Sequence, residues 1–415
     1  MTPVRPVLIV GFTPSLIAEL GRFLPDGGLV LLEEPDPVRK RDIRAAVAAA
    51  PVCRALIESE FLLPGGADSF FLRNSDLDPV AVIPAHDYAV PAAARIAERY
   101  GVPGATLGAA EILRDKHLLR VVAAAAGLAN PRSRLVTSAE DIRAFMAETE
   151  GAVIVKPANR QAAIGTLVVT DPTAVEDAYH ECTQPVEEDC LPDRVPALRM
   201  LVEQFVHGEE YSVEMLYSQG KRAFANVTAK VLYPGAHPVE QGQLVPAQLS
   251  AQLTELLTTE TERLLAAVDF QVGLVHCEWI VDRGRPYLVE CAARQPGDFI
   301  LKLIQAAYDF DVFRAYVELM SGTLPDAPAV AVGGAVTWHR SYPPGTVRTI
   351  DGVEQALAVP GVRTCSVGVK AGGTVAPLRN SWDRPVVVTA CGETVAEALD
   401  RARRAVDLVV IDTTP

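Results

Sequence analysis

Two glutamates on an expected β-hairpin are the residues of this sequence best suited to chemistry. The segment VHCEWIVDRGRPYLVECAAR, residues 275–294, reads as two strands joined by a turn at Gly284, and antiparallel pairing about that turn places Glu278 opposite Glu290. Side chains on facing strands lie roughly 5 Å apart, so two carboxylates there repel each other unless a cation lies between them. A Mg²⁺ ion bridging them to phosphate oxygens would remove the repulsion. A solvated hairpin with incidental acids is the alternative.

The same register assigns the other hairpin side chains to two faces. It sets His276 opposite Ala292 and Ile280 opposite Leu288, and strand alternation puts His276 on the face of Glu278. The other face is apolar and carries Cys277, Trp279, Val281, Val289 and Cys291. We therefore expect both cysteines to be packing residues.

Two lysines are candidates for a phosphate site. Lys156 ends the apolar run 153–155 just before Pro157, and Lys116 falls in an expected helix over residues 111–127. Taken alone, Lys156 is better explained as an ordinary strand-edge charge and Lys116 as a solvent-exposed one. Residues 159–166 could form a mobile loop over phosphates, but the loop has a single glycine, and the chain has no Walker sequence.

A further polar cluster lies between two expected strands at residues 200–205 and 211–217. Glu203 stands near the end of the first strand, Glu210 at the start of the second, and Gly208 in the turn between them. Carboxylates are acceptors, so these two could receive hydrogen bonds from an adenine amino group and a ribose hydroxyl. Taken alone, the segment is better explained as a hairpin with polar ends.

The elements that must position these residues follow from apolar runs and helical periodicity. In the first 105 or so residues, apolar strands alternate with helices, which predicts a parallel sheet covered on both faces. A small α+β unit is expected after residue 325, and residues 182–197 read as a surface loop rich in Pro, Asp and Glu. Other strands are expected at residues 7–10, 29–32, 80–83, 223–229, 333–340, 365–369 and 386–390, and helices at 16–24, 87–101, 139–149, 248–267, 300–322 and from 394.

Composition excludes several classes of protein. The 415 residues carry 38 basic and 52 acidic side chains, a net charge of −14 that disfavours nucleic-acid binding. The seven cysteines form no CxxC pair, which favours reduced thiols in the cytoplasm over disulfides or a zinc ribbon. No targeting segment is evident, and no apolar run approaches the roughly 20 residues of a membrane span. We expect a cytoplasmic protein of two to four domains.

In this order, the segments resemble the ATP-grasp superfamily of carboxylate–amine ligases. Within it, the run Glu290-Cys-Ala-Ala-Arg294-x-x-Gly297-Asp298 is most similar to bacterial L-amino-acid ligases, which make dipeptides or dipeptide-like metabolites. The resemblance covers the whole chain and implies an α/β and α+β multidomain protein with the ATP-grasp fold. It implies a parallel-sheet pre-ATP-grasp domain over residues 1–110, an ATP-grasp core of two subdomains over 111–325, and a C-terminal α+β lid domain over 326–415.

The resemblance also implies roles in binding the nucleotide. Lys116 and Lys156 would hold the α- and β-phosphates of ATP. Glu203 would accept from the adenine amino group, the backbone of Phe205 and Val206 would contact the ring, and Glu210 would bind the ribose.

Metal and substrate roles follow from the same resemblance. Glu278 and Glu290 would ligate Mg²⁺, with Mn²⁺ as a substitute. Lys230 would lie near the γ-phosphate, and Arg294 would steady the carboxylate or acyl-phosphate. His276 would face the substrate pocket, or it would be a hydrogen-bonded strand histidine.

The implied reaction joins two amino-acid or carboxylic-acid substrates through an acyl-phosphate, releasing ADP and phosphate, in a homodimer serving secondary metabolism. Three positions depart from the family pattern: Ala292 where many members have Asn, Gln243 where these ligases often have His, and the glycine-poor loop 160–166. Two alternatives stay open. One is a carboxylase-like or nucleotide-biosynthesis ligase, and the other is a non-catalytic ATP-binding regulator.

Overall fold

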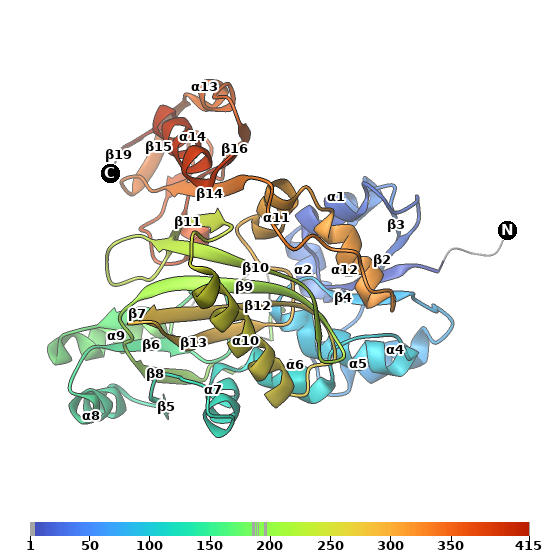
Figure 1. Ribbon diagram of the computed structural model, residues 1–415, viewed down its shortest axis with the longest axis horizontal. Coiled ribbons are helices and arrows are strands. Elements are labelled where there is room, and N and C mark those ends of the chain that lie inside the picture. Colours follow the sequence, from blue (N-terminus) through green and yellow to red (C-terminus); the bar gives the residue numbers. More distant parts are fainter. Residues whose placement is uncertain (1–4, 185–186, 188, 190, 195–196, 415) are drawn as a thin grey trace.

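The structure is a computed structural model that describes residues 5–184, 187, 189, 191–194 and 197–414 (Figure 1). The expected surface loop 182–197 therefore lies partly outside the described residues, and so does Cys190. The six described cysteines are free thiols.

The first sheet is parallel, as predicted. β1 (Val7–Val10) lies between β2 (Leu29–Glu33) and β4 (Ala81–Pro84), and β3 (Cys53–Glu58), which the sequence did not reveal, extends the sheet beyond β2. Alternate residues of these strands enter two separate apolar clusters, one on each face, so both faces are covered. The covering helices are α1 (Pro14–Leu20), α2 (Pro35–Lys40), α3 (Ile43–Ala48), α4 (Gly66–Arg73) and α5 (Val90–Tyr100), the last preceded by the 3-10 turn η1 (Asp87–Ala89).

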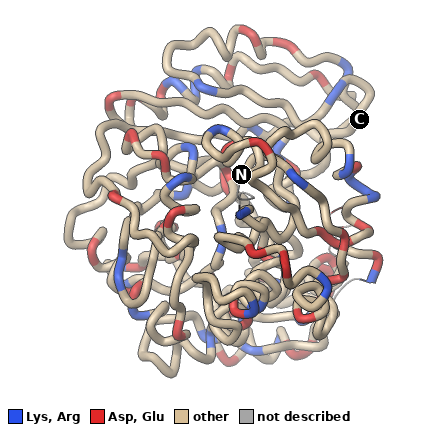
Figure 2. The backbone as a smooth tube through the Cα atoms, turned by 90° about the vertical axis from the view of Figure 1, so that its right-hand side faces the viewer, with Lys and Arg blue, Asp and Glu red and all other residues tan. Residues whose placement is uncertain are grey.

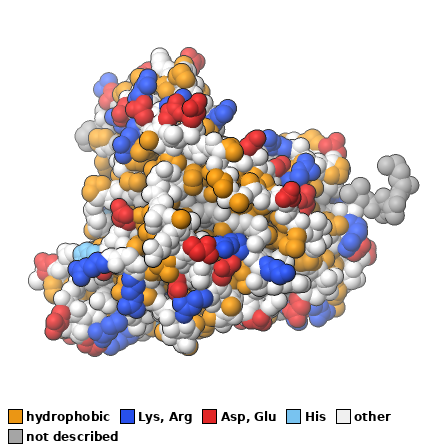
Figure 3. Space-filling model, viewed as in Figure 1, with side chains coloured by type: hydrophobic (Ala, Val, Ile, Leu, Met, Phe, Trp, Pro, Cys, Tyr) orange, Lys and Arg blue, Asp and Glu red, His pale blue; other side chains and the backbone are white. Residues whose placement is uncertain are grey.

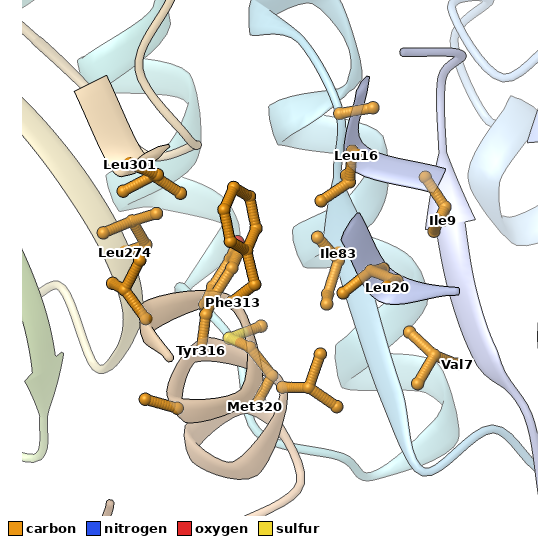
Figure 4. Close-up of a cluster of buried hydrophobic side chains, with 14 of the residues drawn as sticks. Val7, Ile9, Leu16, Leu20, Ile83, Leu274, Leu301, Phe313, Tyr316 and Met320 are labelled. Carbon is orange, nitrogen blue, oxygen red and sulfur yellow. The ribbon is translucent and has the colours of Figure 1, made fainter. Parts of the chain in front are cut away.

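One face of this sheet packs against the middle of the chain. Figure 4 shows side chains of β1, α1 and β4 facing those of α12 (Val312–Met320) and of the strand β12 (Val272–Asp282). Tyr316 of α12 is 1% exposed at the centre of this cluster. Burying a large apolar side chain contributes about 2 kcal/mol, so the cluster fixes the first sheet against the rest of the molecule.

An antiparallel sheet of eight strands crosses the molecule in the order β13-β12-β9-β10-β11-β14-β18-β16. Residues from the middle of the chain form β9 (Glu209–Ser218), β10 (Lys221–Leu232), β11 (Glu240–Val245), β12 and β13 (Arg285–Ala292). The helix α10 (Ala251–Ala267) packs on the apolar face of these strands. The C-terminal part of the chain forms the other three strands, β14 (Gly334–Arg340), β16 (Val362–Val367) and β18 (Val386–Gly392). β11, which was not predicted, joins the two parts.

A third sheet, β5-β8-β6-β7, is also antiparallel. It consists of β5 (Ser133–Val136), β6 (Val153–Pro157), β7 (Leu167–Val169) and β8 (Met200–Gln204), with α8 (Ala139–Thr149), η2 (Pro172–Ala174) and α9 (Val175–Cys182) beside it. The single helix expected over residues 111–127 is wrong, because Asp115 adopts extended dihedrals between α6 (Leu107–Arg114) and α7 (Lys116–Ala125). Its carboxylate accepts from the N–H groups of His117 and Leu118, which begins the second helix and places Lys116 at its first turn.

The C-terminal residues form the expected α+β arrangement. α14 (Val395–Leu408) packs on β14 and β18, and a small sheet contains β15 (Gly345–Asp351), β17 (Thr374–Val375) and β19 (Val410–Thr414). The remaining elements are α13 (Val353–Leu357) and η3 (Ser381–Asp383). The single helix expected over 300–322 is wrong as well, because Asp309 takes a positive φ of 50° between α11 (Ile300–Tyr308) and α12. The predicted boundaries at residues 110 and 325 stay predictions.

Charges of both signs are interspersed over the surface. Figure 2 shows acidic and basic residues scattered over the whole backbone, and Figure 3 shows both kinds mixed on the face seen in Figure 1. Among the described residues, no helix has the length and apolar character needed to cross a bilayer.

Candidate functional site

A cleft of about 540 Å³ brings the predicted site residues together. The long sheet forms its floor, β6 and the connector 205–208 form one side, and segments from both ends of the chain complete its wall. Of the predicted residues, Glu203 alone is absent from the lining. Those that line the cleft are Lys116, Lys156, Phe205, Val206, Glu210, Lys230, His276, Glu278, Glu290 and Arg294.

The two hairpin glutamates lie directly opposite each other, as predicted. The pairs His276–Ala292, Cys277–Cys291 and Glu278–Glu290 follow the register about Gly284. Cys277 and Cys291 are buried in the apolar cluster on the other face, which confirms that they are packing residues.

Beyond Glu278 the predicted register is wrong. A β-bulge shifts the pairing by one residue, so that Trp279 pairs with Leu288 and Ile280 with Tyr287. Leu288 consequently fills the apolar core at 0% exposure, while Val289, predicted to be there, lines the cleft. Because Leu288 and Val289 are adjacent and both apolar, the sequence pattern fits either register.

Lys230 connects three carboxylates at the floor of the cleft. Its ammonium lies 2.6 Å from Glu210 and 2.6 Å from Glu278, with Glu240 at 3.4 Å. Burial would lower the pKa of Lys230, but Glu210 and the other two acids outweigh it and raise the pKa well above its usual value. Burial would raise the pKa of Glu278, but Lys230 and His276 outweigh it and hold this pKa far below the ordinary range. Both groups are therefore charged at neutral pH.

His276 is held between two carboxylates. Its Nδ1 lies 2.9 Å from Glu214 and its Nε2 3.1 Å from Glu278. Burial lowers the pKa of His276, but these two hydrogen bonds raise it to about 10, so the ring is a cation. Glu214 also accepts from Ser212, Asn226 and Thr228 on the same sheet face. Both ring nitrogens are engaged, so the imidazolium orients Glu278, and a direct substrate role stays a prediction.

Lys156 lines the cleft and pairs with a buried cluster of charges behind the cleft wall. Its ammonium is 2.7 Å from Glu203, whose carboxylate also accepts from Arg120 at 2.8 and 3.2 Å. Burial would raise the pKa of Glu203, but Arg120 and then Lys156 lower it to about 2. Burial also lowers the pKa of Lys156, since it removes the charged ammonium from water. An anionic phosphate beside Lys156 would favour its charged form.

Lys116 bridges the hairpin and the loop 160–166. Its ammonium lies 2.8 Å from Glu290 and donates to the backbone carbonyl of Arg160 at 2.9 Å. The loop is a pair of tight turns in which Ala162 and Ala163 both take a positive φ of 56°. Alanine adopts this conformation at a cost that glycine avoids, so the glycine-poor loop stores some strain.

The remaining predicted residues lie at the rim and at the far wall. The N–H of Phe205 donates to the carbonyl of Ala152 at 3.0 Å, and its ring packs edge-on against His207. Arg294 binds Asp87 of η1 through two nitrogens, at 3.0 and 2.6 Å. Burial would raise the pKa of Asp87, but Arg294 and then Arg114 lower it to about 2. The adenine, ribose and acyl-phosphate roles stay predictions.

The two glutamates suit a hard divalent cation. Mg²⁺ takes oxygen ligands and usually binds through one or two carboxylates together with phosphates and waters. Here Glu278 and Glu290 present oxygens from adjacent strands, and lysines partly neutralise them. In the part of the chain that the structure describes, no group of three or more His, Cys, Asp or Glu side chains is arranged as a metal site. The residues therefore fit an ion that arrives with a triphosphate.

Sequence reasoning missed several residues that lie behind the cleft and bind the predicted site residues. Arg120 follows Lys116 by one helical turn, and Glu214 follows Glu210 with the alternation of a strand, so both periodicities could have found them. On the neighbouring strands, Glu210 lies opposite Lys230, and Glu214 lies opposite both Asn226 and His276. Asp87 comes from a distant segment, and no local signal in the sequence points to it.

Comparisons with known proteins agree with this geometry. Residues 149–302 match the family model of the ATP-grasp domain, and residues 340–414 match that of L-amino acid ligase C-terminal domain 2. The alanine–anticapsin ligase of Bacillus subtilis is 25% identical over 56% of this chain and 53% of its own length. An uncharacterized protein of Sinorhizobium fredii, y4rH, is 26% identical over 76% of this chain and 64% of its own length, so the chain spans less than two thirds of either relative.

The fold is shared with a solved structure. The crystal structure of an L-amino acid ligase from Bacillus licheniformis superposes over 100% of both chains with a TM-score of 0.77 at 18% identity. The predicted combination of a parallel N-terminal sheet with an ATP-grasp core is thereby confirmed. The chain therefore has the ATP-grasp fold, and it is similar to the L-amino acid ligases.

Proposed function

We propose that the chain is an ATP-dependent ligase that joins a carboxylate to an amine and forms a dipeptide-like amide. The observation that carries the proposal is the opposed pair Glu278 and Glu290, set in a cleft beside Lys116 and Lys156. A metal-binding carboxylate pair flanked by cations suits a triphosphate, and the similarity to L-amino acid ligases supplies the class of reaction.

The reaction has two steps. A carboxylate oxygen of the first substrate attacks the γ-phosphorus of ATP, the bond from that phosphorus to the β-γ bridging oxygen breaks, and ADP leaves. The neutral amine of the second substrate then attacks the acyl carbon, the C–O bond to phosphate breaks, and the nitrogen loses a proton as the amide forms. Activation is needed because an unmodified carboxylate has no good leaving group.

The residues of the cleft contribute charge and position in this proposal. Lys116 and Lys156 hold phosphate oxygens, and Lys230 keeps Glu278 and Glu210 in place. Mg²⁺ bound between Glu278 and Glu290 would supply charge neutralisation to the β- and γ-phosphates. Arg294, fixed by Asp87, faces the carboxylate or acyl-phosphate.

The substrates in the proposal are two amino acids, or a carboxylic acid and an amino acid. We also propose that the enzyme works as a homodimer in the cytoplasm. Gln243 lines the cleft where similar ligases often carry His, so the identity of the substrates is to be determined by experiment.

A mass-spectrometric screen of amino-acid pairs with Mg-ATP tests the function. An amide product that forms together with ADP and phosphate, only when both partners are present, supports the proposal. ATP consumption that requires bicarbonate and yields no amide would instead identify a carboxylase-like enzyme. ATP binding without turnover by any pair would identify a non-catalytic protein.

A further inference from the structure

A short segment from the C-terminal part of the chain closes one end of the cleft. We call residues 379–384 the strap; it contains the turn η3 and precedes β18. Asp383 accepts from the backbone N–H groups of Arg379 and Asn380, and the Asn380 side chain accepts from the N–H of Trp382. These bonds lie within the strap, so the turn holds its shape by itself.

Arg384 anchors the strap to the floor of the cleft. Its side chain is 5% exposed, and its guanidinium binds both oxygens of Asp298, at 2.8 and 2.6 Å. It also donates to the backbone carbonyls of Ser381 and Glu240. A bidentate pair of this kind fixes orientation as well as distance. Asp298 and Arg384 line the same cleft as Glu290, so the anchor is part of the cleft wall.

Ser381 connects the strap to two other parts of the site. Its N–H donates to the carbonyl of Ala162 at 3.2 Å, in the loop that also receives a hydrogen bond from Lys116. Its hydroxyl donates to Glu240 at 2.9 Å, and Glu240 lies 3.4 Å from Lys230. The strap therefore contacts the loop on one side of the cleft and the charged floor on the other.

Trp382 presents a large apolar surface to the cleft. It lines the cleft and is 49% exposed, whereas Trp279 and Trp338 are 0% and 6% exposed. Because about half of the Trp382 side chain is exposed to solvent, it does not belong to an apolar core of the protein. Over a reaction site, it can cover reacting groups and displace water from them.

We propose that the strap shields the acyl-phosphate from water, with Arg384 as the positioning residue that holds it and Trp382 as the covering side chain. This inference rests on the proposed function. Water attacking the acyl carbon would break the C–O bond to phosphate, regenerate the carboxylate and release phosphate without an amide. Amine attack releases the same phosphate with one amide, so the ratio of phosphate to amide measures the shielding.

The test compares Trp382→Ala with Leu357→Ala, a matched loss of a 46% exposed apolar side chain on α13 away from the cleft. We expect a ratio near one for the wild type and Leu357→Ala, and a severalfold higher ratio for Trp382→Ala with little change in KM for ATP. Amide formation by the wild type with an unchanged ratio in Trp382→Ala would overturn the inference. No amide from the wild type with any substrate pair would overturn the proposed function instead.

The anchor is tested without turnover. The measurement is hydrogen exchange of the Ser381 N–H, which binds the Ala162 carbonyl outside the strap. Exchange should be slow in the wild type, severalfold faster in the Asp298→Asn and Arg384→Gln double variant, and intermediate in Arg384→Lys, which keeps the charge but loses the bidentate geometry. The double variant removes both charges, so no buried ion is left alone. Equal exchange in all three proteins would refute Arg384 as the anchor.

Discussion

Each lysine predicted to meet a phosphate lies beside a carboxylate in this structure. Lys116 pairs with Glu290, Lys156 with Glu203, and Lys230 with Glu278. Such pairs keep the buried charges of the cleft neutralised. Binding of Mg-ATP would exchange partners, because the metal takes the glutamates while the phosphates take the lysines. We therefore expect nucleotide and metal affinities to depend on each other.

Glu290→Ala tests the metal assignment. Loss of one of the two carboxylates should reduce amino-acid-dependent ADP release by roughly 100-fold or more, because charge at the transferring phosphate is no longer neutralised. The measurement is coupled ADP release at saturating Mg²⁺, with Glu255→Ala, an exposed acid on α10, as the control. Near-normal ADP release in Glu290→Ala would show that the metal lies elsewhere.

Lys156→Met tests the phosphate assignment and keeps the volume of the side chain. We expect KM for ATP to rise by roughly tenfold, because one charge-assisted hydrogen bond to phosphate is worth about 1.5–3 kcal/mol. Initial rates over a range of ATP concentrations give the result, and Lys221→Met on the exposed edge of β10 is the control. An unchanged KM would exclude contact with ATP.

At the residue scale, contacts between site residues could be predicted where the residues lie on two strands joined by a recognisable turn. The opposition of Glu278 and Glu290 was predicted correctly from a turn centred on Gly284. The pairs next to the turn are nevertheless offset by one residue from that prediction, and the bulge after Glu278 restores the predicted register. The Arg294–Asp87 pair could not be predicted, because 207 residues separate its members and only tertiary packing joins them. The roles of the cleft residues in binding remain predictions.

At the element scale, single residues decide where strands and helices bend or stop. Asp115 divides one expected helix into α6 and α7, and that division places Lys116 at the start of a helix. The bulge after Glu278 likewise places Val289 in the cleft wall. Periodicity identified the amphipathic segments but not these breaks, because an aspartate or an extra apolar residue fits a continuous pattern.

Gly208→Ala tests the connector that carries Phe205 and Val206. Gly208 has a φ of 152°, and a Cβ there would collide with the carbonyl of Val281 on β12. The substitution should push the connector away from β12 and weaken nucleotide binding severalfold, as measured by calorimetric titration with ADP and Mg²⁺.

Gly220→Ala is the matched control for that experiment. Gly220 also has a positive φ, of 79°, but a Cβ at this residue would meet no atom within 4 Å. It should lose about 1 kcal/mol of stability from backbone strain and bind nucleotide normally. Equal nucleotide affinity in both variants would show that the contact with Val281 does not position the connector.

At the scale of the whole molecule, the cleft is assembled from parts distant in sequence. Asp87 belongs to the N-terminal part, Arg294 to the loop after the hairpin, and Arg384 to the C-terminal part, yet their ion pairs meet around one cavity. Damage to the packing in any of these parts should therefore reach the site.

Asp87→Asn tests this assembly through pH. The pKa of Asp87 is about 2 in the folded protein, below its ordinary value of 3.8, so its ionised form stabilises the fold above pH 4. A pKa shift of this size corresponds to a contribution of roughly 2 kcal/mol to the free energy of unfolding. The difference in free energy of unfolding between wild type and Asp87→Asn should be of this size at pH 7 and shrink as pH falls from about 4 toward 2.

Urea unfolding between pH 7 and pH 3 gives that difference, and Asp326→Asn on the surface serves as the control. A difference that stays constant across this range would mean that the Asp87–Arg294 pair contributes no charge-dependent stability.

The eight-stranded sheet continues without interruption from β11 into β14, with Gly242 to Val245 paired in register against Ala335 to Trp338. A truncated chain ending near residue 325 would keep β11 but lack its partner strand β14, so the backbone N–H and C=O groups along one edge of β11 would have no hydrogen-bond partners. Such bare edges recruit strands from other molecules. Shortened versions of this protein should therefore self-associate in solution, and soluble fragments would need to retain the C-terminal strands.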